Sequence, residues 1–102
     1  MSGEPSPIYI GRFPAIKAGD IQDLYIDIEA DLVTGEAIDS VAFTVTDSDG
    51  DTVAEVVGVH NETDTRTDFR ITAPVAGAYT LTAVFTIDDG QKITRIAKLR
   101  IY

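Results

Sequence analysis

Three aspartates, Asp47, Asp49 and Asp51, alternate with small residues and are the side chains of this chain best arranged to do chemistry. Clustered carboxylate oxygens on a tight turn are what a hard cation such as Ca²⁺ binds. The segment departs from an EF-hand loop, because the sixth and twelfth positions counted from Asp47 hold Thr52 and Gly58 instead of glycine and glutamate. Aspartate also bonds its own turn backbone, and glycine accepts positive φ. A plain hairpin turn is therefore the favoured interpretation, and a weak calcium site is the alternative.

Other catalytic constellations are missing from the sequence. His60 is the single histidine, and no residue pattern pairs it with metal ligands or with a nucleophile. The serines lack a motif such as G-x-S-x-G, and the chain has no cysteine, which excludes thiol chemistry and cysteine-ligated metals. The sequence therefore predicts a protein that is no enzyme and carries no cofactor.

The charge of the chain restricts its partners. The 102 residues carry a net charge of -9, with 17 acidic residues against 8 lysines and arginines. Because binding to nucleic acid depends on neutralising phosphates, this balance argues against a nucleic-acid partner. The charge is also unevenly distributed along the chain. Residues 20–68 contain most of the acidic residues, whereas residues 91–102 contain lysines and arginines and no acidic residue. Either the last strand makes cross-strand charge contacts within the fold, or copies dock with an acidic face against a basic strand.

The elements that must position these residues are strands. From Tyr79 to Ile87 the odd positions are apolar or aromatic and the even positions are mostly threonine, which is the period of a strand with one buried face. An Asp-Asp-Gly turn at 88–90 leads into a last strand that runs toward Tyr102, and Asp-Gly between such runs is a strong hairpin signal. Tyr79, two residues after Gly77, stands where immunoglobulin-like folds place a tyrosine corner.

Further strands are expected upstream of this hairpin, with a polar loop over residues 60–65. We expect the strands at Ile8–Phe13, Leu24–Ala30, Val41–Val45, Thr52–Val59 and a segment through Phe69 and Ile71. Turn signals recur about every 8 to 12 residues, and no stretch has a helical period. The predicted fold class is therefore all-β, an immunoglobulin-like antiparallel β-sandwich of about seven strands.

A chain of this length, with 44% hydrophobic residues, suits one compact domain. We expect residues 1–12 to form an N-terminal arm or first edge strand and residues 13–102 to form the sandwich. The apolar run Ile8-Tyr9-Ile10 is too short for a signal-peptide core, and no stretch approaches the roughly 20 apolar residues that cross a bilayer. The sequence therefore predicts synthesis in the cytoplasm and no membrane partner.

The order of these features resembles a known group, the small immunoglobulin-like virion structural proteins of tailed bacteriophages. A looser likeness is to the N-terminal domain of phage baseplate upper proteins. The likeness runs from about Phe13 to Tyr102 and rests on a Lys-x-Gly-Asp opening, a central Asp-Gly turn and a Gly-x-Tyr strand that ends in an Asp-Gly hairpin. These motifs are Lys17 to Asp20, Asp49-Gly50, Gly77 to Tyr79 and Asp89-Gly90.

The resemblance implies a non-enzymatic virion protein made in the cytoplasm of a host bacterium. We expect an accessory of the head or neck, such as a capsid decoration, collar or connector-associated protein, that docks in multiple copies. Its partners would be other virion proteins and copies of itself. An arm and an exposed edge strand would carry the contact. The residues predicted to bind partners are Ile8, Tyr9, Ile10, Arg12, Phe13, Arg95, Lys98 and Arg100.

Two alternatives remain open. One is a component of the tail or baseplate. The other is an immunoglobulin-like module that binds carbohydrate or a cell surface, but such sugar-binding faces usually expose Trp and Tyr, and this chain has no tryptophan.

Overall fold

The computed structural model describes residues 8–13 and 15–102, and it describes side chains for Phe13 and from Ala15 onward. Within this part of the chain there are seven strands, one short 3₁₀ helix and no α-helix. The strands are β1 (Ile8–Arg12), β2 (Ile21–Asp27), β3 (Ile38–Thr46), β4 (Val57–Glu62), β5 (Arg66–Thr72), β6 (Gly77–Ile87) and β7 (Lys92–Ile101). The 3₁₀ helix η1 (Glu29–Asp31) follows β2, and no helix among the described residues is long and apolar enough to cross a bilayer.

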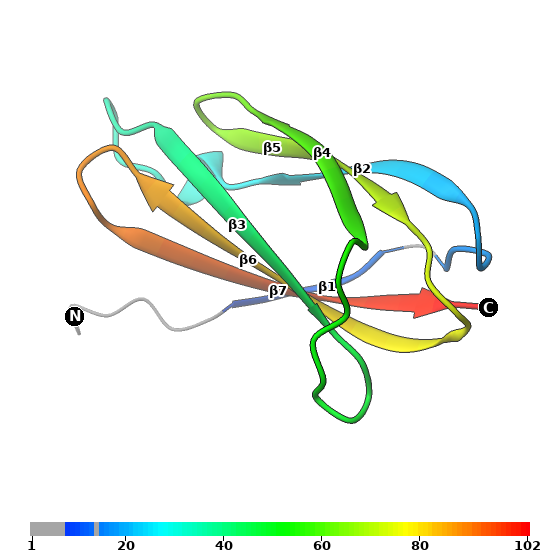
Figure 1. Cartoon of the computed structure of the whole chain (residues 1–102). Coiled ribbons are helices and arrows are strands. Elements are labelled where there is room, and N and C mark those ends of the chain that lie inside the picture. The colour runs from blue at the N-terminus through cyan, green and yellow to red at the C-terminus, as the bar shows by residue number, and fades with distance from the viewer. Residues whose placement is uncertain (1–7, 14) are drawn as a thin grey trace.

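The strands form two sheets that face each other as a sandwich (Figure 1). One sheet has the order β1-β7-β6-β3 and the other the order β2-β5-β4. This is the immunoglobulin-like arrangement, in which the second, fifth and fourth strands share one sheet and the third, sixth and seventh share the other. The predicted fold class is confirmed. All pairings are antiparallel except that of β1, which runs parallel to β7.

The core lies between the sheets and follows the alternation of the sequence. Every odd residue of β6 from Tyr79 to Ile87 is at most 6% exposed, and the even residues are half-buried on the outer face. Their buried partners on the facing sheet include Ile26, Phe69 and Ile71, and Val45 of β3 and Leu99 of β7 lie beside them in the same sheet. The predicted one-sided burial of this strand and the turn at 88–90 are confirmed.

The tyrosine corner is present. The hydroxyl of Tyr79 donates a hydrogen bond of 2.6 Å to the carbonyl oxygen of Val75, four residues upstream. The ring itself is buried in the core. The bond therefore fastens the connection between the sheets to the start of β6, as the position of Tyr79 after Gly77 predicts.

The prediction of a strand over Thr52–Val59 is wrong. Residues 54 and 55 form a turn, Glu55 has a φ of 64°, and β4 begins only at Val57 and runs to Glu62. Residues 53–59 are apolar at both odd and even positions except at Glu55 and Gly58, and the structure explains this by loop packing: Val56 is buried, and Val53 packs against the core from outside any sheet. The expected polar loop over residues 60–65 shrinks accordingly to the hairpin at 63–65.

The strand expected at Leu24–Ala30 is shifted. It begins earlier, at Ile21, and ends at Asp27, where the carboxylate accepts a hydrogen bond of 2.8 Å from the N–H of Glu29. This local bond lies at the start of η1. Ile28 still reaches the core and is fully buried.

Candidate interaction surfaces

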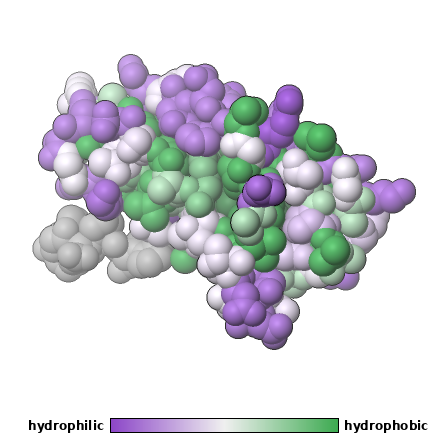
Figure 2. Space-filling model, in the orientation of Figure 1, coloured by the Kyte–Doolittle hydropathy of each residue, from purple (hydrophilic) through white to green (hydrophobic). Residues whose placement is uncertain are grey.

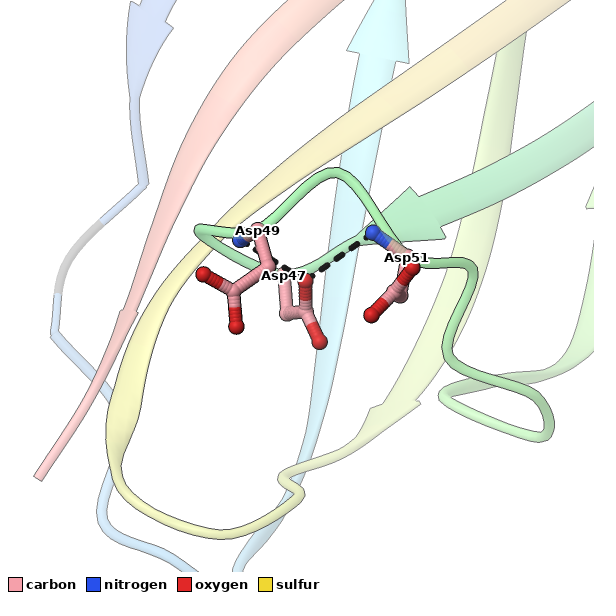
Figure 3. A group of neighbouring side chains, drawn as sticks. All are labelled: Asp47, Asp49 and Asp51. Carbon is pink, nitrogen blue, oxygen red and sulfur yellow. Dashed lines mark hydrogen bonds between the residues drawn. The ribbon is translucent and has the colours of Figure 1, made fainter.

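The three alternating aspartates do come together in the turn after β3. Their carboxylate oxygens lie within 4.8 Å of one another, and this is the one such group among the described residues (Figure 3). One oxygen of Asp47 accepts the N–H groups of Asp49 at 2.9 Å and Asp51 at 3.0 Å. Asp47 therefore acts as the cap of its own turn, which accounts for its position without a cation. The turn projects as a hydrophilic knob from the end of the sandwich (Figure 2).

His60 lies on β4, where it packs against the neighbouring sheet. Its ring meets Phe43 of β3 at 5.2 Å in an edge-on arrangement, and its Nδ1 lies 2.6 Å from a carboxylate oxygen of Glu62. The same oxygen accepts the buried hydroxyl of Thr67 at 2.9 Å. The ring contact ties β4 to β3 of the facing sheet, and none of these residues belongs to a group of metal-ligating side chains in the described part of the chain.

Arg95, one of the predicted partner-binding residues, is buried. It occupies the inner row of β7 with Ile93, Ala97 and Leu99, is 4% exposed, and forms an ion pair with Asp31 of η1. Its Nη1 also donates to the carbonyl oxygen of Thr94 at 2.9 Å. The burial of Arg95 could have been predicted from its place in the odd-numbered, apolar row of β7. A prediction based only on the positive charges of residues 91–102 overlooked it. We therefore leave Arg95 out of any surface discussed below.

Lys98 and Arg100 point the other way. They lie in the even, outward row of β7 with Lys92, and all three are exposed. Lys92 Nζ donates to the hydroxyl of Thr86 at 3.0 Å, and Lys98 Nζ donates to the hydroxyl of Thr80 at 3.2 Å. The two lysines are thus held against the threonines of β6 across the sheet.

These side chains belong to one face, which we call the threonine–lysine face. Its members are the outward residues of β3, β6 and β7 in paired rows: Ser40, Ala42, Thr44, Thr46, Ala78, Thr80, Thr82, Val84, Thr86, Lys92, Thr94, Ile96, Lys98 and Arg100. None of these residues is acidic, although the whole chain carries a net charge of -9; the exposed Asp39 lies at the border of the face, at the register shift of β3. None of its three cations takes part in an ion pair among the described residues.

The cations of the other sheet are already neutralised. On β5, Arg66 pairs with Asp68 at 2.7 Å and Arg70 pairs with Asp23 of β2 at 2.8 Å. The hydrogen bond from Arg70 lowers the pKa of Asp23, and the reciprocal bond raises the pKa of Arg70. Arg66 also lies 4.6 Å from the centre of the Tyr25 ring. The two sheets therefore present outer faces of different electrostatic character.

The N-terminal part of the predicted surface is only partly described. The backbone of β1 pairs with β7 from Ile8↔Arg95 to Arg12↔Lys98, which places it beside the threonine–lysine face. The side chains of Ile8, Tyr9, Ile10 and Arg12, and all of residues 1–7, lie outside what the structure describes. The ring of Phe13 packs edge-on against Phe69 at 6.0 Å and so belongs to the core margin.

Comparison with known proteins gives one family. The family model described as "Gp77: Podophage GP4 fiber-tail adaptor protein gp77" matches residues 17–100. No curated protein sequence matches the chain significantly.

Solved structures with a similar fold share 13% identity with the chain. The crystal structure of the ZIG-8 IG1 homodimer has a TM-score of 0.43, with 97% of this chain and 82% of that chain covered. For the monoclinic form of the ZIG-8–RIG-5 IG1–IG1 heterodimer the values are 0.44, 98% and 86%, and for the solution structure of Amebosin they are 0.42, 95% and 99%.

Proposed function

The chain belongs to the family of the podophage GP4 fiber-tail adaptor protein gp77 and is thus a tail-associated phage structural protein; we propose that it docks through its threonine–lysine face onto an acidic surface of a neighbouring virion protein. In this role it would help to join a fibre to the tail. The adaptor description of the family supports the tail alternative better than a position on the head or neck.

The observation that carries the proposal is the separation of charge. A chain with a net charge of -9 repels acidic surfaces as a whole, yet the paired rows of this face hold three cations and no acid, with Asp39 at the register shift of β3 on their border. Complementary charge between two faces speeds their encounter and fixes their relative orientation. An acidic partner is therefore favoured to approach this protein from the side of β7.

The composition of the face favours docking for a second reason. Most of its side chains are threonine, alanine, valine or isoleucine, and β-branched side chains have restricted χ1 rotamers. Little side-chain entropy is then lost when such a surface is covered. The lysines that would lose more are already held by the hydroxyls of Thr80 and Thr86.

The carbohydrate-binding alternative gains no support from this face. None of its described residues is aromatic, whereas sugars usually stack on exposed aromatic rings. Tyr25, one of the exposed tyrosines, lies on the other sheet with the Arg66 guanidinium beside its ring. We therefore do not develop this alternative further.

A charge-matched pair of variants tests the proposal. Lys98→Glu reverses a cation on the threonine–lysine face, and Lys17→Glu makes the same change in net charge at an exposed lysine outside it. Each purified variant is mixed with phage particles assembled without this protein, and the bound amount is measured after sedimentation. We expect Lys98→Glu to reduce binding about ten-fold or more, as for the loss of a central charge pair, and Lys17→Glu to bind like the unaltered chain.

Equal binding by the two variants, with circular dichroism showing that both are folded, contradicts the proposed face. Increasing salt provides a second check. Because exposed charges are screened, binding of the unaltered chain should weaken between about 0.05 and 0.5 M salt.

A further inference from the structure

The four edge strands of the two sheets differ in regularity. The pairing of β1, β3 and β4 with their neighbours is interrupted by register shifts, between Tyr9 and Arg12, Ile38 and Ser40, and Val57 and His60 respectively. β2 instead pairs with β5 over all seven of its residues without a shift. Bulges are a common way to keep a sheet edge from accepting another strand. Among the described residues, β2 is therefore the edge that lacks this protection.

The outward groups of β2 can be assigned from its two ends. Asp20 accepts a backbone hydrogen bond from Ala73 on the β5 side, and Ile28 donates one to Thr65 on the same side. Because backbone direction alternates along an unbulged strand, the even residues between them bond β5 and the odd ones point away. Asp23, Tyr25 and Asp27 thus direct their N–H and C=O groups outward, and none has a backbone partner among the described residues.

The position is a natural one for another strand. Immunoglobulin constant-type sandwiches place their first strand beside the second, whereas here β1 pairs with β7 on the other sheet. No described segment of the chain therefore pairs with the edge of β2 from Ile21 to Asp27. Ile21 is 62% exposed and Tyr25 is 56% exposed at this edge.

The chemistry beside this edge is acidic on the solvent side and apolar toward the core. In the outward row of β2 Asp27 and Asp23 are exposed, Asp23 being paired with Arg70, and Asp20 and Glu29 are exposed at the two ends of the strand; Leu24 of the opposite row packs against the core. A strand added here would place alternate side chains beside the acids and beside Leu24. Its best sequence would alternate lysine or arginine with apolar residues.

We infer that the free edge of β2 binds an extended, cationic segment of a partner protein, which adds a fourth strand to the β2-β5-β4 sheet. Main-chain hydrogen bonds would supply affinity, and the alternate side chains would supply specificity. The inference goes beyond the proposed function, because it concerns the other sheet and another class of contact. It stands whether or not the threonine–lysine face proves to be a tail contact.

The test uses a capped heptapeptide of alternating valine and lysine as the probe, added to the full chain and followed by NMR with amide hydrogen exchange. We expect exchange at Asp23, Tyr25 and Asp27 to slow about ten-fold or more, because these amides gain partners on binding. The amides of Leu24 and Ile26 already bond β5 and should change little. No slowing with millimolar peptide, or slowing at β3 or β4 instead, overturns the inference.

Three controls separate strand addition from attraction by charge alone. The matching valine–glutamate peptide should not bind, and equal binding by it overturns the assignment of a cationic partner. Tyr25→Pro removes one outward N–H and should weaken binding at least several-fold, whereas Tyr25→Val keeps that N–H and should retain it. Two further versions of the valine–lysine peptide are made, each N-methylated at the amides of one of its two edges. We expect one of them to bind and the other not to, because only one edge of an added strand bonds β2. Equal binding by both overturns the inference even if Tyr25→Pro fails to fold.

Discussion

At the residue scale, the pair of Arg95 and Asp31 shows how a charge can serve the fold. The Arg95 side chain is 4% exposed and the Asp31 side chain is 43% exposed, so the arginine loses most of its hydration on folding. The ion pair and the bond to the carbonyl oxygen of Thr94 offset that loss. Together they tie η1 to the inner row of β7.

Removing either partner of this pair should therefore have unequal effects. Asp31→Asn leaves the guanidinium buried without a counter-charge and should lower the free energy of unfolding by about 1–3 kcal/mol, while Arg95→Met should cost about 1 kcal/mol or less. Urea denaturation followed by circular dichroism measures both. A larger loss for Arg95→Met than for Asp31→Asn would show that the charge contributes more than its desolvation costs.

Tyr79 gives a second prediction at this scale. Tyr79→Phe keeps the buried ring but leaves the carbonyl oxygen of Val75 without its 2.6 Å partner, so we expect a loss of about 1–2 kcal/mol in unfolding free energy. Tyr25→Phe is the control, because it removes a hydroxyl from an exposed ring of the other sheet. Equal stability of the two variants in urea would contradict a stabilising role for the corner bond.

At the scale of the elements, the turns decide where strands end. The turn after β3 is closed by one carboxylate, that of Asp47, and the turn after β6 has a similar local bond, from the N–H of Gln91 to Asp89 at 3.0 Å. The Gln91 bond lowers the pKa of Asp89. Such bonds need only residues that are near in sequence, which is why these turns were predictable.

The two interpretations of the Asp47 turn lead to different outcomes. If Asp47 caps the turn, Asp47→Ala should destabilise the chain by about 1 kcal/mol and Asp49→Ala should have little effect, because the bonded carboxylate is that of Asp47. Melting temperatures should also be the same in calcium and in a chelator. A rise in melting temperature with calcium that both substitutions abolish would favour the cation site instead.

At the scale of the whole molecule, the two outer faces differ in charge and the N-terminal strand borders the basic one. β1 pairs with β7, whose outward row carries Lys98 and Arg100. The division into an arm at 1–12 and a sandwich at 13–102 remains a prediction, and so does docking in multiple copies. The described part of the molecule measures about 40 × 26 × 20 Å along its principal axes. The outer faces of the two sheets are therefore separate surfaces, and each can contact a different partner.

Light scattering tests the role of the arm. We expect the full chain to form oligomers and the chain without residues 1–10 to be a folded monomer that no longer binds particles, because the deletion removes three of the five residues of β1, the strand beside the basic face. A chain without residues 1–7 is the control that leaves β1 intact. Oligomers that survive both deletions would contradict a contact made by the arm, and a monomer in all three forms would leave docking on other virion proteins as the remaining route.

The sequence by itself determined the all-β class, the closing hairpin, the tyrosine corner and the absence of a catalytic pattern, because alternation and turn chemistry depend on residues close together in the chain. The tertiary structure alone decided that β1 lies beside β7, that Arg95 faces Asp31, that Val53 and Val56 fill a loop instead of a strand, and that β2 keeps an open edge. These features depend on pairings between distant segments, which compete with one another for the same edges and the same buried space. The local periodicity of the sequence contains no information about which of these pairings forms.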